Sequence, residues 1–151
     1  MEPGRKMPSE SVTSRSPVAF EEIEHTADRA LIINGRNLEE LFVNAARGLN
    51  SLMGADGDLN STPLTKSIAL DAMDAESLLV DWLSELAYWA EAEMLVFSKF
   101  ELQDVSPTRV KAKLFGCRAT QLENHIKAVT YHNLEIVKTE TGLAATVVFD
   151  V

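Results

Sequence analysis

Two stretches of the sequence space their apolar residues like amphipathic α-helices, and this pattern constrains the fold more than any other feature. The first helix is expected to begin after Asn37, which can cap it, and to end at Gly54, which tolerates a left-handed backbone. The second is expected to begin after Asp74. Their apolar stripes consist of Leu38, Leu41, Phe42, Ala45, Leu49 and Leu52, and of Leu78, Leu79, Trp82, Leu83, Leu86 and Trp89. Two such stripes need a shared apolar surface to cover.

That surface is expected to be a β-sheet. The runs that are typical of strands are residues 30–33, 67–72, 96–102, 109–115, 131–137 and 143–150. Tight turns at residues 106–108 and 139–142 separate neighbouring runs, which implies antiparallel pairing. The sequence therefore predicts an α+β fold, with a mainly antiparallel β-sheet packed against two amphipathic α-helices.

The first 17 residues differ in composition from the rest of the chain. They hold three of the five prolines and few apolar side chains, so we expect a disordered tail at residues 1–17 and one domain over residues 18–151. No stretch has the roughly 18 apolar residues of a membrane span. A single cysteine, Cys117, suits a reducing compartment, and we expect a cytoplasmic protein.

The charge balance is acidic, with 14 Lys and Arg against 23 Asp and Glu and a net charge of −9. Because nucleic-acid binding needs a basic surface, this balance argues against direct binding of RNA or DNA. The same surplus would be repelled by an anionic membrane. It is compatible with a basic protein partner or with a hard cation. The oligomeric state does not follow from the sequence, and we favour a monomer.

Several acidic or reactive groups are interpreted as structural. Residues 56–62 resemble the start of a calcium loop but lack the glycine and the bidentate glutamate that an EF-hand requires. Asp81 and Glu85 share a helix face, where solvated carboxylates are common. Cys117 is interpreted as a small, semi-buried thiol at the end of a strand. None of these groups is a favoured site.

Two other acids flank apolar strands. Asp28 precedes the apolar run 30–33, and Asp150 lies in the apolar run 147–151. A carboxylate in such a strand is costly unless it is solvated, paired or bound to a cation. If the native chain stops at Val151, its terminal oxygens would join these acids in a site suited to Ca²⁺, Mg²⁺ or Mn²⁺. A solvated strand end remains the alternative. His25 and Asp28 could also form a hydrolytic pair, although no serine motif accompanies them.

Five segments of the sequence are informative when they are taken together. They are His25-Thr26-Ala27-Asp28, Leu38-Glu39-Glu40-Leu41-Phe42-Val43-Asn44-Ala45-Ala46, Leu78-Leu79-Val80-Asp81-Trp82-Leu83-Ser84-Glu85-Leu86, Lys127-Ala128-Val129-Thr130-Tyr131-His132 and Phe149-Asp150-Val151. In this order and spacing they resemble the archease family, and the resemblance covers about residues 20–151. Archeases are small acidic α+β proteins, not themselves known as enzymes, that assist the GTP-dependent tRNA-splicing RNA ligase.

The resemblance implies a function and a site. We expect a non-catalytic, metal-binding accessory factor that promotes guanylylation of the RNA ligase, sustains its multiple turnover and reaches RNA only through that ligase. Asp28, Asp150 and Val151 match the family's metal-binding positions, with Ca²⁺ as the first expectation and Mg²⁺ or Mn²⁺ as alternatives. Lys127 and His25 match its functional surface, although for His25 we favour a scaffold role, such as orienting an acid. Two other functions stay open, a divalent-metal-dependent phosphohydrolase and a metal-independent chaperone or interaction module.

Overall fold

The computed structural model describes residues 17–24, 28–57 and 61–151. Within these residues the helices are α2 (Leu38–Met53) and α3 (Ala75–Glu93), at the positions that the apolar spacing predicts. Asp74 caps α3 by accepting a hydrogen bond from the Ser77 amide. Gly54 ends α2 in the left-handed conformation, at φ 59°. No helix in the described part of the chain has the length and apolarity needed to cross a membrane.

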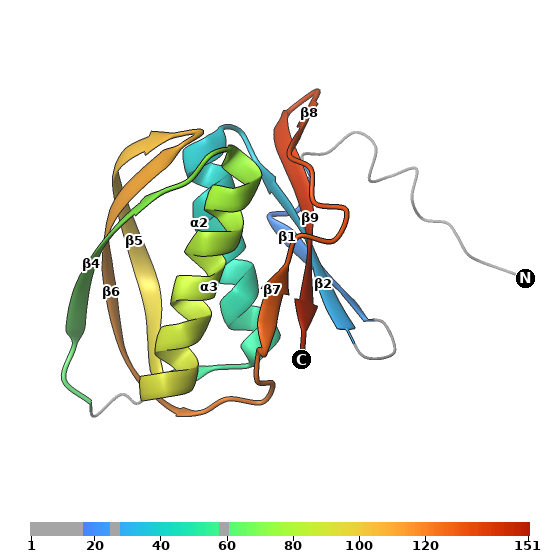
Figure 1. The fold of residues 1–151 in the computed structure, drawn as a ribbon. Coiled ribbons are helices and arrows are strands. Elements are labelled where there is room, and N and C mark those ends of the chain that lie inside the picture. The colour runs from blue at the N-terminus through green and yellow to red at the C-terminus, as the bar shows by residue number, and fades with distance from the viewer. Residues whose placement is uncertain (1–16, 25–27, 58–60) are drawn as a thin grey trace, which may run out of the picture.

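The strands form two mainly antiparallel sheets (Figure 1). Sheet I has the order β1-β2-β9-β7, and β8 also pairs with β9. Its strands are β1 (Phe20–Glu24), β2 (Asp28–Gly35), β7 (Ala128–Thr130), β8 (Val137–Thr139) and β9 (Gly142–Asp150). In sheet II, the central strand β6 pairs with β3, β4 and β5. Its strands are β3 (Asp56–Gly57), β4 (Leu64–Asp71), β5 (Leu95–Ser106) and β6 (Arg109–Gln121).

The two helices lie between the two sheets, so each sheet buries one face against them (Figure 1). Sheet I contributes Leu31, Ile33, Val147 and Phe149 to the core, and sheet II contributes Val110 and Leu114. Trp82 of α3 is fully buried, and its indole Nε1 donates a hydrogen bond to the Phe42 carbonyl of α2 at 2.9 Å. This arrangement confirms the α+β class and leaves the outer faces of both sheets open to solvent.

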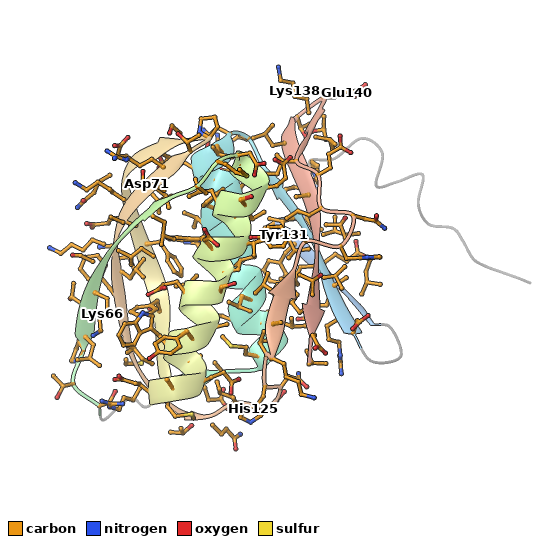
Figure 2. The ribbon with its side chains drawn as sticks, in the orientation of Figure 1. Lys66, Asp71, His125, Tyr131, Lys138 and Glu140 are labelled. Carbon is orange, nitrogen blue, oxygen red and sulfur yellow. The ribbon has the colours of Figure 1, made fainter. Side chains whose placement is uncertain are left out.

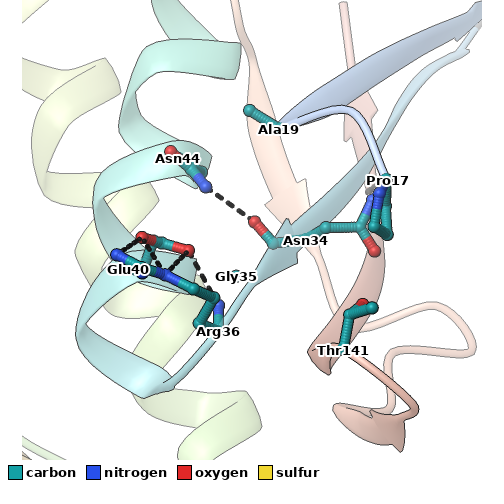
Figure 3. Close-up of a pocket in the computed structure, with 8 residues that line it drawn as sticks. All are labelled: Pro17, Ala19, Asn34, Gly35, Arg36, Glu40, Asn44 and Thr141. Carbon is teal, nitrogen blue, oxygen red and sulfur yellow. Dashed lines mark hydrogen bonds and ion pairs between the residues drawn. The ribbon is translucent and has the colours of Figure 1, made fainter. Parts of the chain in front are cut away.

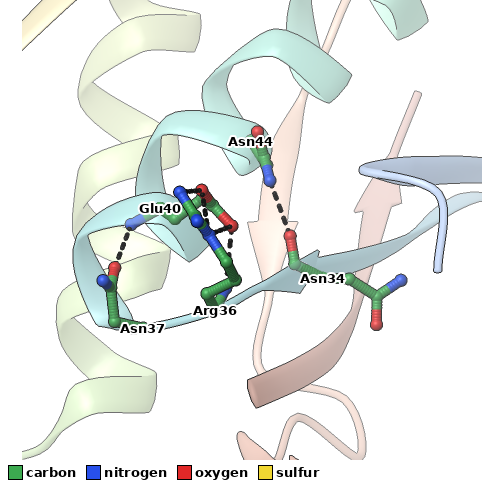
Figure 4. A network of polar contacts seen from close by, with 5 residues as sticks. All are labelled: Asn34, Arg36, Asn37, Glu40 and Asn44. Carbon is green, nitrogen blue, oxygen red and sulfur yellow. Dashed lines mark hydrogen bonds and ion pairs between the residues drawn. The ribbon is translucent and has the colours of Figure 1, made fainter. Parts of the chain in front are cut away.

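The N-terminus of α2 differs in one detail from a capping box. Asn37 caps the helix as expected, because its Oδ1 accepts from the Glu40 amide at 2.9 Å. The Glu40 carboxylate, however, reaches one residue further back and accepts from the Arg36 amide and guanidinium (Figure 4). These hydrogen bonds hold the pKa of Glu40 below its usual range. The turn between β2 and α2 is thereby tied to the helix.

The predicted strand over residues 131–137 is wrong. Residues 131–136 form a turn and a loop between β7 and β8. Asn133 adopts a left-handed conformation at φ 52°, and the Leu134 amide donates to the Tyr131 carbonyl at 3.0 Å. The Ile136 amide donates to Glu76 Oε2 of α3 instead of to a strand. The strand pairing therefore lies on either side of this loop.

Candidate metal centre

Asp28 and Asp150 are brought together by the pairing of β2 with β9. They are direct partners in the antiparallel register, so their Cα atoms are about 4.5–5.5 Å apart and their side chains leave the same face of sheet I. Both residues are exposed. In Figure 1, the start of β2 and the end of β9 lie at the same end of sheet I. The fold thus pairs the two acids that the sequence analysis singled out.

Lys127 joins this pair from the other side of β9. Ala128, the first residue of β7, pairs with Asp150, and the Lys127 amide donates to the Asp150 carbonyl at 2.7 Å. Lys127 is exposed, whereas Val151 is half-buried and packs against the core. Three separate segments of the chain therefore meet at one sheet end, where they place two carboxylates beside an amine-bearing residue.

Two glutamates of α3 anchor the chain on either side of β7, Glu91 before it and Glu76 after it. Glu91 Oε2 accepts from the Ile126 amide at 3.0 Å, and its Oε1 lies 2.9 Å from His125 Nδ1. At the other end of the helix, Glu76 holds the Ile136 amide. Sequence reasoning missed both anchors, since a glutamate on a helix surface carries no sign that it will bond a distant backbone amide.

A cavity of about 260 Å³ lies between α3 and the Lys127 segment. Its lining is mainly apolar and includes Ala87, Ile126 and Val129, with Lys127 and Glu91 also contributing. Tyr88 lines it as well, although it is 58% exposed. His125 and Tyr131, labelled in Figure 2, lie just before and just after the lining residues 126–129 in the chain. Lys127 and Ala128, which line the cavity, are also the backbone neighbours of Asp150 on β9.

The donor atoms at the sheet end suit a hard cation. Carboxylate and backbone oxygens are the ligands that Ca²⁺, Mg²⁺ and Mn²⁺ prefer, and both acids are exposed to water that can complete the coordination. Within residues 17–24, 28–57 and 61–151, no three His, Cys, Asp or Glu side chains are close enough to hold a metal. A cation here would therefore depend on backbone oxygens and water besides the two carboxylates.

The remaining sequence candidates are separate from this centre or cannot be placed. His25 lies outside the described residues, so its role stays a prediction, as does the centre of the acidic stretch 56–62. Glu85 accepts a hydrogen bond from the Trp89 indole at 3.1 Å, while Asp81 is half-buried on α3. Cys117 is half-buried within β6, not at its end, because that strand continues to Gln121.

A larger cavity, of about 310 Å³, lies at the opposite end of β2 (Figure 3). It is lined by Pro17, Ala19, Asn34, Gly35, Arg36, Glu40, Asn44 and Thr141. Asn34 is six residues along β2 from Asp28, a separation of about 20 Å. The charged residues that line this cavity, Arg36 and Glu40, form an ion pair, with Arg36 Nη2 3.0 Å from Glu40 Oε2. This cavity is therefore separate from the paired acids.

The fold and the site together define a class, a small α+β protein that gathers two acids and a lysine at one end of a sheet. The sequence profile described as the Archease protein family matches residues 20–151. The chain belongs to the archease family.

Named relatives agree with this assignment. The chain is 38% identical to the protein archease of Methanosarcina mazei over 140 residues, which cover 87% of this chain and 95% of the relative. It is also 38% identical to the protein archease of Saccharolobus islandicus over 138 residues, which cover 88% of this chain and 99% of the relative.

Two solved structures are similar in fold as well as in sequence. A solution structure of a protein from Methanobacterium thermoautotrophicum has a TM-score of 0.63 and 31% identity, and the match covers 88% of this chain and 99% of that one. A crystal structure from Thermotoga maritima, described as an archease and possible chaperone, has a TM-score of 0.64 and 27% identity. The match covers 91% of this chain and 97% of that one. The resemblance inferred from the five segments is thereby confirmed.

Proposed function

We propose that this protein is a non-catalytic, metal-binding accessory factor of the GTP-dependent tRNA-splicing RNA ligase. It would promote guanylylation of the ligase and so sustain its multiple turnover in the cytoplasm. The observation that carries the proposal is the pairing of Asp28 with Asp150, with Lys127 bonded through its amide to the Asp150 carbonyl. These are the positions at which the family resemblance implies function.

The chemistry of guanylyl transfer is consistent with such a site. A triphosphate must approach a nucleophile, and cations offset the negative charge on the phosphates. We propose that Asp28, Asp150 and the backbone oxygen of Val151 hold a divalent cation, with Ca²⁺ first and Mg²⁺ or Mn²⁺ as alternatives. The exposed Lys127 would present a further positive charge to the ligase beside it.

The direct test is a guanylylation and RNA-ligation assay with the cognate ligase. Asp28→Ala and Asp150→Ala are each expected to leave the fold intact and to abolish stimulation. Asp56→Ala is the matched control, because Asp56 is an exposed acid on sheet II, away from the pair. Full stimulation by both folded variants would overturn the proposal.

The same proteins separate the alternatives. Metal-dependent release of phosphate from nucleotides by the isolated protein would favour a phosphohydrolase, and its loss in Asp28→Ala would assign that activity to the same acids. Calorimetry that detects no binding of Ca²⁺, Mg²⁺ or Mn²⁺ would favour a metal-independent chaperone or interaction module.

A further inference from the structure

The charges of this acidic protein are divided unevenly between its layers. Strands β4, β5 and β6 of sheet II carry six Lys and Arg against three Asp and Glu, whereas the rest of residues 18–151 carries five against eighteen. At physiological salt the Debye length is about 8 Å, so charges on sheet I act only weakly across the helix layer. The local charge of sheet II therefore differs in sign from the total.

Four of the basic residues of sheet II, Lys99, Arg109, Lys111 and Lys113, lie on its solvent-facing side, whereas Lys66 packs over the Trp89 ring of α3. In the register of β4, β6 and β5, one row across the sheet is Thr65, Phe115 and Lys99. The next rows are Ser67, Lys113 and Glu101, and then Ala69, Lys111 and Asp104. We define the lysine face as Thr65, Ser67, Lys99, Lys111, Lys113 and Phe115, which Glu101 and Asp104 of β5 border.

Some of the basic side chains on this side form ion pairs with a carboxylate, and others do not. Arg109 is paired with Asp71 at 2.9 Å and Lys99 with Glu101 at 3.5 Å. Among the residues that the structure describes, no carboxylate lies within ion-pair distance of Lys111 or Lys113. Two positions apart on one strand, these lysines have Cα atoms about 6.8 Å apart.

The neighbours of the two lysines make a platform that suits a nucleotide chain. The β4 side chains beside them are small, so both amines stay exposed, and the hydroxyls of Thr65 and Ser67 can donate to phosphate or to a ribose 2′-OH. In the same layer, Lys99 and Lys113 lie 5.1 and 5.8 Å from the ring centre of Phe115. An aromatic ring among cations is the surface on which bases of single-stranded nucleic acid stack.

We propose that the lysine face binds single-stranded RNA, with Lys111 and Lys113 on phosphates and Phe115 against a base. The complementary charge and the aromatic ring favour RNA over an acidic protein segment, which would use the lysines but not the ring. Sheet II lies on the opposite side of the helices from the paired acids (Figure 1). RNA on this face would thus leave the Asp28–Asp150 end free for a protein partner. The overall charge of the chain does not indicate such a surface.

The test measures binding of the isolated full-length protein to a fluorescently labelled single-stranded RNA by anisotropy. A chelator is present and no ligase is added, so the result is independent of the proposed accessory function. Lys111→Glu/Lys113→Glu is expected to weaken binding tenfold or more, and the milder Lys111→Gln/Lys113→Gln variant threefold or more. Lys138→Glu, which changes an exposed lysine on sheet I, is the control and is expected to stay within twofold of the natural protein.

Salt and competitors complete the test. Two phosphate contacts predict that affinity falls about sevenfold between 50 and 200 mM salt, since each contact adds about −0.7 to the logarithmic slope for single strands. Phe115→Leu is expected to weaken RNA binding without changing how steeply the affinity falls with salt, because the ring makes no phosphate contact. The proposal is overturned by absence of RNA binding at millimolar protein, by equal losses in Lys138→Glu, or by poly-glutamate or anionic vesicles binding as tightly as RNA.

Discussion

Asp28 and Asp150 face each other directly, at the first residue of β2 and the last residue of β9. Two exposed carboxylates at this separation repel each other unless a cation lies between them. The prediction is that divalent cations raise the melting temperature of the natural protein and that Asp28→Asn and Asp150→Asn remove this rise. Without metal and at low salt, both variants are expected to melt above the natural protein.

Differential scanning fluorimetry with increasing CaCl₂, MgCl₂ or MnCl₂ checks this prediction. Asp56→Asn, which neutralises an exposed acid elsewhere, is expected to keep the full metal-dependent rise. An undiminished rise in both Asp28→Asn and Asp150→Asn would place any cation at another site.

Glu91 is predicted to keep Lys127 in place beside Asp150. Glu91→Ala removes the acceptor of the Ile126 amide, which costs about 1–2 kcal/mol locally and speeds exchange of that amide about five- to thirtyfold. Hydrogen exchange followed by NMR measures this directly. Glu93→Ala, on the same helical turn, is the control and is expected to leave the exchange unchanged. Equal exchange in Glu91→Ala would show that the segment is held by other contacts.

The two tryptophans are expected to differ sharply in their contribution to stability. Trp82→Phe leaves a gap in the core and removes the donor to the Phe42 carbonyl, so we expect a loss of about 2–4 kcal/mol in the free energy of unfolding. Trp89 is only half-buried and bonds an accessible carboxylate, so Trp89→Phe is expected to cost less than about 1 kcal/mol. Urea unfolding of both variants tests the difference, and similar losses would contradict it.

Asp74 is predicted to make the stability of α3 depend on pH. The hydrogen bonds from Ser77 hold the pKa of Asp74 below its ordinary value of 3.8. Because the pKa is lower in the folded state, this stabilisation is complete above pH 3.8 and is lost as the pH falls through the folded-state value. Asp74→Asn caps the helix without titrating. As the pH falls from 5 to 2, the melting temperature of Asp74→Asn is therefore expected to rise relative to that of the natural protein. A difference in melting temperature that stays constant over this range would contradict this assignment.

Local sequence signals were sufficient for the helices and the tight turns. The caps at Asn37 and Asp74, the apolar spacing and Gly54 act within a few residues, so they could be recognised without knowledge of the fold. The two-residue connection between β8 and β9 is of the same kind. Strands whose existence depends on distant partners were harder to predict. β1, β3 and β7 were missed, and residues 131–136 of the strand predicted over 131–137 form a turn and a loop, in which the Ile136 amide bonds Glu76.

The sequence by itself determined which residue types were available, namely two acids in apolar strand ends, a lysine in a recognisable segment and a large surplus of negative charge. Only the tertiary structure decided which of them meet. Asp28 and Asp150 are 122 positions apart in the chain, and the antiparallel register of β2 and β9 alone makes them neighbours. The division of charge between the two sheets was likewise undetermined, because total charge is a sum over residues and the field at a surface depends on where each residue lies.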